Sequence, residues 1–292
     1  MGNTAAWLTP ALVVALALVM LGLGLTLTLE DFRRLRQHPR AVVLALVIQV
    51  ALLPAACVAL IAVLGVPPLY AVGLMLLAAS PGGVTANLFS HLFGGHVAMN
   101  LSLTAVNTVL SIVTLPLIAN WAIGFYAGGG QVVPLQFAKV AEVVMIIGVP
   151  VAMGMSVRAR RPAFADRMER PMKAFSALVL VAITVLAIAK EWTALTESLA
   201  EIGGAVIAFN LISLGAGYGL SRAARLPRPL CIAISFEIGI HNSTLAIFIA
   251  LSVLQQFPLA LPAALYSVSM YVTAALFGML LTRTAPRGAA AA

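Results

Sequence analysis

The stretch Ser80-Pro81-Gly82-Gly83-Val84-Thr85-Ala86-Asn87 interrupts a long apolar run of this sequence. Pro81 lacks a backbone N–H and clashes with the preceding helical turn, and glycines make it easier for the backbone to leave a helix. A second stretch, Glu237-Ile238-Gly239-Ile240-His241-Asn242, interrupts another apolar run. The two stretches predict two broken helices, with Pro81 and Gly239 as the residues that break them.

The composition around these stretches indicates a membrane protein. Hydrophobic residues make up 62% of the chain and charged residues 9%, against about 45–50% and about 25% in soluble domains. A hydrocarbon core about 30 Å thick takes roughly 20 apolar residues per helical crossing. Since irregular backbone in lipid must be buried in protein or line a water-filled cavity, we expect both breaks to face the protein interior.

Nine apolar segments, separated by Pro, Gly and charged residues, are long enough to cross a bilayer. We therefore expect an all-α polytopic membrane protein with nine transmembrane helices in a single domain. The segments lie near 7–28, 41–64, 69–92, 97–126, 134–157, 171–190, 202–222, 229–253 and 261–283.

Lys and Arg are concentrated in alternate loops. With the N-terminus outside, fifteen of the 17 basic residues fall in cytoplasmic loops, as the positive-inside rule requires. The net charge of +8 therefore indicates orientation in a plasma or inner membrane, with the C-terminus cytoplasmic, and not nucleic-acid binding. No Lys or Arg precedes the first apolar run, so we expect no cleaved signal peptide.

The nine segments divide into two sets of four with opposite orientation, over 7–126 and 171–283, separated by the fifth segment. This arrangement is typical of inverted-topology repeats, which place a binding site near the bilayer midplane at their interface. The third member of each set carries one of the two broken stretches. The symmetry therefore predicts that the two breaks meet at a common site.

Glu237 is an acid deep in an apolar segment that contains no Lys or Arg between Pro229 and Val253. Such a group costs about 2.5–3.5 kcal/mol to insert, so we expect it to bind a cation from solution: a proton, sodium or an amine. Carbonyls freed at half-helix ends favour sodium. The uncharged oxygens available to join them belong to Gln49, Asn87, Asn100 and Thr104, whereas we interpret Ser102, Asn107 and Asn210 as ordinary interhelical hydrogen-bonding groups.

Over nearly its whole length the chain resembles the bile acid:sodium symporter family. The resemblance rests on Gly24-Leu25-Thr26-Leu27 with Asp31-Phe32, on Gln49, on Ser80-Pro81-Gly82-Gly83 with Asn87, and on Glu237-x-Gly239-x-x-Asn242. It implies a core domain that contains two crossed discontinuous helices, beside a panel domain. The core would comprise helices within 41–126 and 202–283, and the panel would comprise 7–28, 134–157 and 171–190.

The resemblance also implies sodium sites. One would use Asn87, Asn100, Thr104 and Glu237, and the other Gln49, Glu237, His241 and the backbone carbonyls of Ile238 and Ile240. Ala86 stands where the family usually has Ser, and His241 where it usually has Gln. Because imidazole is a poor sodium ligand and titrates near neutral pH, we expect one sodium site to persist and the other to be weakened or replaced by proton coupling. Alternatively, a neutral His241 only hydrogen-bonds a neighbour.

Two half-helix N-termini at one cavity favour an anionic substrate. The resemblance implies sodium-coupled symport of an organic anion by alternating access, with a small carboxylate such as pantoate or a 2-oxo acid, or a bile-salt-like anion, as substrate. We expect substrate contacts from Gly82, Gly83, Asn87 and Asn242. No enzymatic activity and no obligate protein partner are expected.

Three alternatives remain. A proton-coupled transporter of organic anions would use Glu237 and His241. An arsenite-type exporter of the same superfamily would need a thiol at the site, yet Cys57 and Cys231 lie beside neither break. An intramembrane hydrolase would need paired aspartates or a Ser-His arrangement at depth, and the sequence has no GxSxG motif.

Overall fold

The computed structural model describes residues 4–83, 85–128, 137–168 and 192–283, together with residues 171, 172, 174, 175 and 178. Within this part of the chain the regular structure is helical, apart from one isolated β-bridge. Four of its helices are long and apolar enough to cross a membrane: Pro39–Leu64, Val97–Tyr126, Leu199–Ala223 and Phe257–Arg283. The all-α membrane class is confirmed, while nine crossings and inverted repeats stay predictions.

The helices follow the apolar segments of the sequence, and both expected breaks divide a segment in two. The sixth segment, 171–190, lies largely outside the described residues. The α-helices are α1 (Thr4–Thr26), α2 (Leu29–Arg34), α3 (Pro39–Val47), α4 (Leu53–Leu64), α5 (Pro68–Ala79), α6 (Thr85–Leu92), α7 (Val97–Tyr126), α8 (Phe137–Arg160), α10 (Trp192–Ala223), α11 (Arg228–Gly239), α12 (Ser243–Phe248) and α13 (Leu261–Arg283). A π-helical turn, Ile48–Leu52, joins α3 to α4, and another, Ile249–Val253, follows α12.

Local sequence explains where several helices begin and end. Pro39 and Pro68 stand in the first turns of α3 and α5, where a missing N–H costs nothing because it would have no helical partner. Gly65 ends α4 in the left-handed conformation, with φ of 62°, which glycine adopts without strain. Thr28 and Asp31 form a capping box that starts α2.

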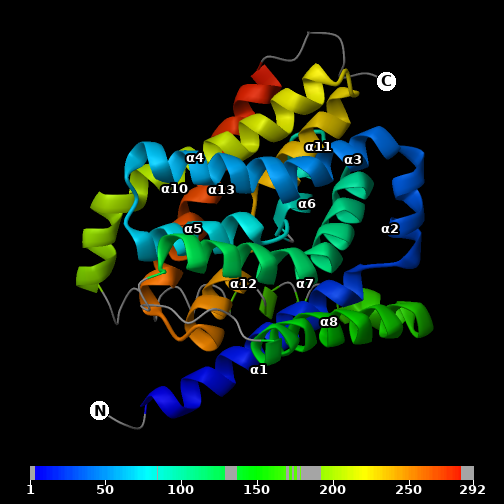
Figure 1. Cartoon of the computed structure of the whole chain (residues 1–292). Helices are drawn as coiled ribbons and strands as arrows, with labels where there is room; N and C mark the ends of the chain where they lie inside the picture. Colours follow the sequence, from blue (N-terminus) through cyan, green and yellow to red (C-terminus); the bar gives the residue numbers. More distant parts are fainter. Residues whose placement is uncertain are drawn as a thin grey trace.

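Helices α1 and α8 lie side by side along one edge of the molecule, below the other helices in Figure 1. A glycine on each helix permits this close approach. A Cβ atom on Gly24 would lie 2.3 Å from the carbonyl oxygen of Val151, and one on Gly154 would lie 2.5 Å from that of Leu21. Small residues are what membrane helices use where their backbones touch. The division into panel and core stays a prediction.

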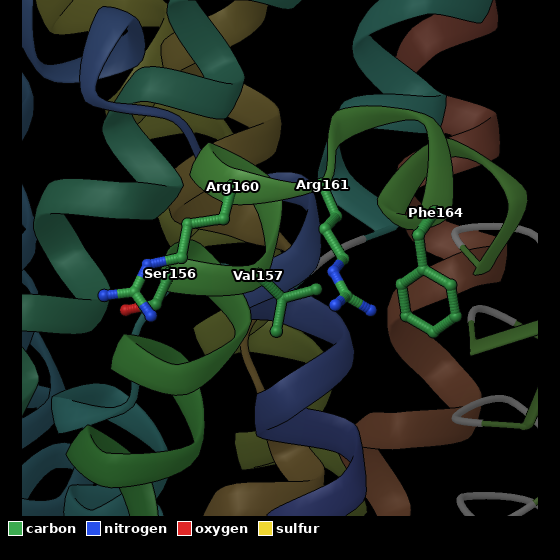
Figure 2. A pocket seen from close by; sticks show the side chains of 5 residues that line it. All are labelled: Ser156, Val157, Arg160, Arg161 and Phe164. Carbon is green, nitrogen blue, oxygen red and sulfur yellow. The ribbon is translucent and has the colours of Figure 1, made fainter.

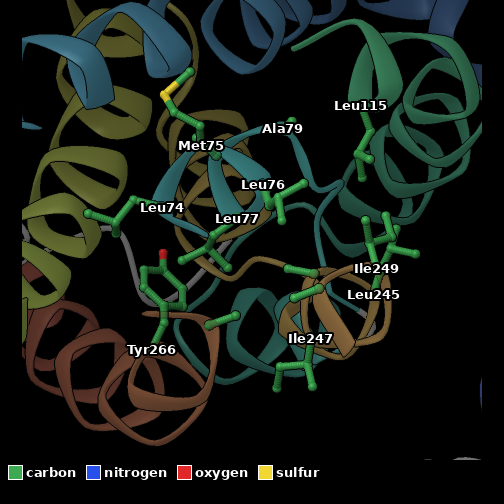
Figure 3. Packing of buried hydrophobic residues seen from close by; sticks show 14 of the residues in the cluster. Leu74, Met75, Leu76, Leu77, Ala79, Leu115, Leu245, Ile247, Ile249 and Tyr266 are labelled. Carbon is green, nitrogen blue, oxygen red and sulfur yellow. The ribbon is translucent and has the colours of Figure 1, made fainter. Parts of the chain in front are cut away.

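The two interrupted helices lie within the body formed by the remaining helices (Figure 1). Every residue of α5 from Ala71 to Ala79 is buried, so this half-helix is enclosed on all sides and not only along one face. Figure 3 shows its leucines packed near Leu245, Ile247 and Ile249 of the second interrupted helix and near Tyr266 of α13. The core therefore encloses the breaks and fixes their positions.

Candidate functional site

The two breaks pair with each other through their backbones. Gly82 and His241 form an isolated antiparallel β-bridge. The backbone N–H of Gly83 donates to the carbonyl of Ile240 at 2.6 Å, and that of Asn242 donates to the carbonyl of Pro81 at 2.8 Å. Backbone N–H and C=O groups that lose their helical partners at one break thus hydrogen-bond to the other break. Buried backbone groups need such partners.

The residues that break the helices lie at the expected places. Helix α5 ends at Ala79 and α6 begins at Thr85, so Pro81 falls inside the first break. Gly239 is the last residue of α11, and the chain leaves the helix immediately after it, at Ile240. There a Cβ atom on Gly239 would lie 2.3 Å from the Cδ2 atom of Leu214 in α10. Gly239 therefore allows close packing of α11 on α10 at the edge of the break.

Glu237, on α11, is fully buried beside this crossing. The hydroxyl of Thr104 donates to its Oε2 atom at 2.6 Å, and the side-chain amide of Asn107 donates to its Oε1 atom at 3.0 Å. Both donors come from α7. No Lys or Arg among the described residues forms an ion pair with Glu237. A buried carboxylate without a counter-charge is unfavourable, so this group is neutralised either by a proton or by another bound cation.

Gly82 brings the first break directly against this carboxyl group. A Cβ atom on Gly82 would lie 2.3 Å from Oε1 of Glu237 and 2.4 Å from its carboxyl carbon. Any side chain at position 82 would therefore collide with the Glu237 side chain. By comparison, a Cβ atom on Gly83 would lie 3.2 Å from the carbonyl oxygen of His241. The contact at Gly82 joins the Pro-Gly-Gly break and the acid into one site.

On another side of the crossing, Gln49 and His241 gather around the carbonyl of Ser80. The side-chain amide of Gln49 donates to this oxygen at 3.1 Å and to that of Ala78 at 3.3 Å. The Nδ1 atom of His241 lies 3.3 Å from the same oxygen. Gln49 belongs to the π-helical turn of the second segment, and turns of this kind frequently occur at functional sites.

Aromatic side chains enclose His241. Its ring stacks on Phe209 at a centroid distance of 5.6 Å and meets the ring of Tyr266 edge to face at 5.5 Å. Its Nε2 atom is buried and hydrogen-bonds to no described residue. The imidazole therefore brings two nitrogens and no oxygen to this part of the crossing.

Several buried side-chain oxygens at the crossing have no donor. The Oε1 atom of Gln49 and the Oδ1 atoms of Asn100 and Asn107 accept no hydrogen bond from the described residues. Like the Glu237 carboxylate, these are hard oxygen atoms, the ligand type that suits alkali and alkaline-earth cations. Within the described part of the chain no cluster of three His, Cys, Asp or Glu side chains could hold a transition metal. The types of donor at the crossing are therefore compatible with sodium.

Three of the predicted site residues, Asn100, Thr104 and Glu237, are linked by hydrogen bonds that involve side chains and the backbone. Asn100 lies one turn before Thr104, and its side-chain amide donates to the carbonyl of Ala233 on α11 at 2.7 Å. The carbonyl of Asn100 accepts from the Thr104 hydroxyl at 3.0 Å. Thr104, Asn100 and Glu237 thus form one network between α7 and α11. Asn87 is half-buried in the first turn of α6 and is not one of the two donors to Glu237.

The backbone positions expected at the second site lie at the end of α11. Ile238 is buried within α11. The carbonyl of Ile240 accepts the hydrogen bond from Gly83, and a carbonyl oxygen retains a second lone pair for another partner. Asn242 begins α12, where its Oδ1 atom accepts from the N–H of Leu245 at 3.1 Å. Its side chain therefore has a helix-capping role in this conformation.

Asn107 and Asn210 were interpreted in the sequence as ordinary interhelical hydrogen-bonding groups, and both donate to residues of other helices. Asn107 touches the carboxylate itself, and its position was detectable because Asn100, Thr104 and Asn107 recur at the spacing of one helix face. Asn210 of α10 donates to the carbonyl of Gly239 at 2.7 Å and to the hydroxyl of Tyr266 at 2.6 Å. No local pattern indicates this contact, because the three residues lie on separate elements.

A family model and several known proteins match this chain. A family model described as the Sodium Bile acid symporter family matches residues 13–198. The P3 protein of Mus musculus is 28% identical over 219 residues, which are 75% of this chain and 46% of that protein. The chain therefore spans about half the length of this relative.

Two other relatives cover more of the chain. The "Probable sodium/metabolite cotransporter BASS2, chloroplastic" of Oryza sativa subsp. japonica is 28% identical over 274 residues, 92% of this chain and 63% of that protein. The "Uncharacterized sodium-dependent transporter YocS" of Bacillus subtilis (strain 168) is 27% identical over 267 residues, 90% of this chain and 80% of that protein. These are names of transporters and not of enzymes. The chain belongs to the sodium bile acid symporter family.

Proposed function

We propose that this chain is a secondary active transporter that couples the movement of sodium to that of an organic anion. The observation that carries the proposal is the buried Glu237 carboxylate, which two uncharged side chains hold and no described basic residue neutralises. A sodium ion would balance this charge, which is the condition for burying either partner. Family membership and the names of two relatives support sodium as the coupling ion.

The first sodium would bind between α7 and the crossing. Its ligands would be the carboxylate of Glu237 with oxygens of Asn87, Asn100 and Thr104. We add the side-chain oxygen of Asn107, which accepts no hydrogen bond from the described residues. These residues lie on one face of α7, on α6 and on α11. A displacement of α11 against α7 would therefore change the coordination, so ion binding could select one conformation of the transporter.

The second sodium would bind on the side of Gln49, with Glu237, His241 and the carbonyls of Ile238 and Ile240. We propose that this site is weak. His241 offers a ring nitrogen where a hard cation needs an oxygen. The Oε1 atom of Gln49, which is buried and accepts no hydrogen bond from the described residues, supports a remaining role for Gln49.

The anionic substrate would bind where the chain re-enters helical structure after each break. Helices α6 and α12 begin there, and helix N-termini favour anions. Gly82, Gly83, Asn87 and Asn242 border these starts. A small carboxylate, such as pantoate or a 2-oxo acid, suits backbone donors as well as the anionic group of a bile salt does. Alternating access would then move the breaks relative to α1 and α8, in a plasma membrane with the N-terminus outside.

Uptake by the full chain in liposomes tests this proposal. Radiolabelled pantoate, pyruvate and taurocholate are offered with an inward sodium gradient and with potassium in its place. We expect sodium-dependent accumulation of at least one anion, its loss in Glu237→Gln, and its retention in Glu30→Gln, which changes an exposed acid. If every anion accumulated equally in sodium and in potassium, sodium coupling would be contradicted.

The same liposomes decide between sodium and proton coupling. An inward proton gradient without sodium drives accumulation only if the proton-coupled alternative, with Glu237 and His241 as the carriers, is correct. An arsenite-type export would need a thiol at the crossing. The Cys231 thiol instead donates to the carbonyl of Leu226, before α11 begins, and Cys57 is buried in α4.

A further inference from the structure

The chain makes a fixed turn at the end of α8. Helix α8 ends at Arg160, and residues 162–168 are helical again. The guanidinium of Arg158 pairs with the carboxylate of Asp166 across this turn. The N–H of Arg161 donates to the carbonyl of Val157 at 2.8 Å. The turn is therefore held both by its backbone and by an ion pair that neutralises Arg158.

A surface pocket of about 360 Å³ opens in this turn, lined by Ser156, Val157, Arg160, Arg161 and Phe164. In Figure 2 the two arginine side chains lie on either side of Val157, and Phe164 lies beyond Arg161. Neither Arg160 nor Arg161 forms an ion pair with any carboxylate of the described residues. The Ser156 hydroxyl donates to the carbonyl of Ala152 in its own helix at 2.8 Å. Two guanidinium groups that pair with no carboxylate of the described residues thus line the pocket.

An exposed apolar face of α8 leads to this pocket. Met145, Val149 and Met153 follow one another at one-turn intervals and are 60%, 40% and 57% exposed. Val157 continues this line into the pocket, and Phe164, at its rim, is 49% exposed. In a membrane protein, an exposed apolar face of this kind contacts acyl chains. Arg160 and Arg161 therefore lie at the end of the face of α8 that contacts acyl chains.

We propose that this pocket binds the phosphate headgroup of an anionic phospholipid whose acyl chains lie along the Met145–Met153 face of α8. The planar guanidinium fork matches phosphate oxygens, and the two arginines offer one such fork on each side of Val157. A soluble phosphate would meet the same arginines without the apolar face. By the predicted orientation, the lipid belongs to the cytoplasmic leaflet, whose lipids are the more anionic.

The position of the pocket gives the lipid a structural role. Gly154, where α8 touches α1, lies two residues before the pocket begins at Ser156. A headgroup held by Arg160 and Arg161 fixes the end of the α1–α8 pair at the membrane surface. This proposal does not depend on which ion or anion the chain transports.

Lipid binding to the purified full chain tests the proposal. Native mass spectrometry measures the affinity for phosphatidylglycerol, with phosphatidylcholine as the zwitterionic reference. Since each arginine near an anionic surface strengthens binding roughly five-fold, we expect Arg160→Gln/Arg161→Gln to weaken phosphatidylglycerol binding by about 25-fold. The control, Arg222→Gln/Arg225→Gln, removes two exposed arginines elsewhere and is expected to change it less than two-fold.

Two further measurements separate the lipid from other occupants. Glycerol phosphate in millimolar excess should not displace phosphatidylglycerol, and Met153→Gln should weaken lipid binding while both arginines are present. Displacement by glycerol phosphate, with no effect of Met153→Gln, would assign a soluble phosphate to the pocket and overturn the lipid proposal. Equal losses in the two arginine double variants would show that binding follows net charge only and would overturn the pocket as the site.

Discussion

At the scale of single residues, sodium coupling depends in this proposal on the buried carboxyl group of Glu237. Its carboxylate accepts hydrogen bonds from Thr104 and Asn107. It forms no ion pair with the basic residues that the structure describes. Hydrogen bonds orient a buried carboxylate, but they do not cancel its charge. The proposed cation ligand Glu237 and the two residues that orient its carboxylate, Thr104 and Asn107, can therefore be changed one at a time by mutation.

Asn107→Ala tests the aiming of the carboxylate. Because a hydrogen bond to a charged group contributes about 1.5–3 kcal/mol, we expect the sodium concentration for half-maximal uptake to rise by one to two orders of magnitude. Ser102→Ala is the matched control on α7, because the Ser102 hydroxyl bonds within its own helix, to the carbonyl of Ala98. A change below two-fold for Asn107→Ala would remove Asn107 from the site.

His241→Gln tests the weakness of the second sodium site. A glutamine at this position offers an amide oxygen to the cation where imidazole offers nitrogen. We expect the sodium dependence of uptake to become steeper, with the Hill coefficient moving from about one toward two, whereas the exposed His91→Gln on α6 leaves it unchanged. A Hill coefficient of two in the wild-type chain would show that His241 does not weaken the second site.

At the scale of elements, the candidate site lies where the breaks of the two interrupted helices pair with each other. The first break needs glycine because its backbone touches the Glu237 carboxyl group, and the second needs a partner for the carbonyls that α11 leaves free. Asn210 and the hydroxyl of Tyr266 both donate to the carbonyl of Gly239, the latter at 2.8 Å. This carbonyl is therefore held by α10 and α13 and is less available to a cation than that of Ile240.

Gly82→Ala tests the contact between the break and the acid. A methyl group would lie 2.3 Å from Oε1 of Glu237, so either the carboxylate or the break must shift. We expect sodium-dependent uptake to fall by at least ten-fold while the chain still inserts in the membrane. In Gly204→Ala, where a Cβ atom meets nothing within 4 Å, uptake should persist. Gly83→Ala should lie between the two, because its closest contact would be 3.2 Å.

Helix breaks can be predicted from sequence because their causes are local. Pro81 with two glycines, and an acid near Gly239 in an apolar run, are visible without any tertiary information. The partners of the breaks are not local. Gly83 bonds to Ile240 across more than 150 residues, and Asn210 meets Tyr266 only because α10 packs against α13. Asn107 was an intermediate case, since its helix face was visible but its contact with Glu237 was not.

At the scale of the whole molecule, the α1–α8 pair is the element against which the breaks would move. The pair packs through Gly24 and Gly154 at backbone contact distance. The apolar composition predicted the membrane class correctly. The number of crossings and the inverted symmetry depend on the segment 171–190, which lies largely outside the described residues, and they stay predictions.

Equilibrium binding of radioactive sodium to the purified full chain tests the central claim most directly, because it needs neither a known substrate nor a known orientation. We predict saturable sodium binding by the wild-type chain and by Glu30→Gln, and its loss in Glu237→Gln, with all three proteins equally monodisperse. Saturable binding of unchanged affinity in Glu237→Gln would contradict the claim that this buried carboxylate, held by α7 at the crossing of the two breaks, is the sodium ligand.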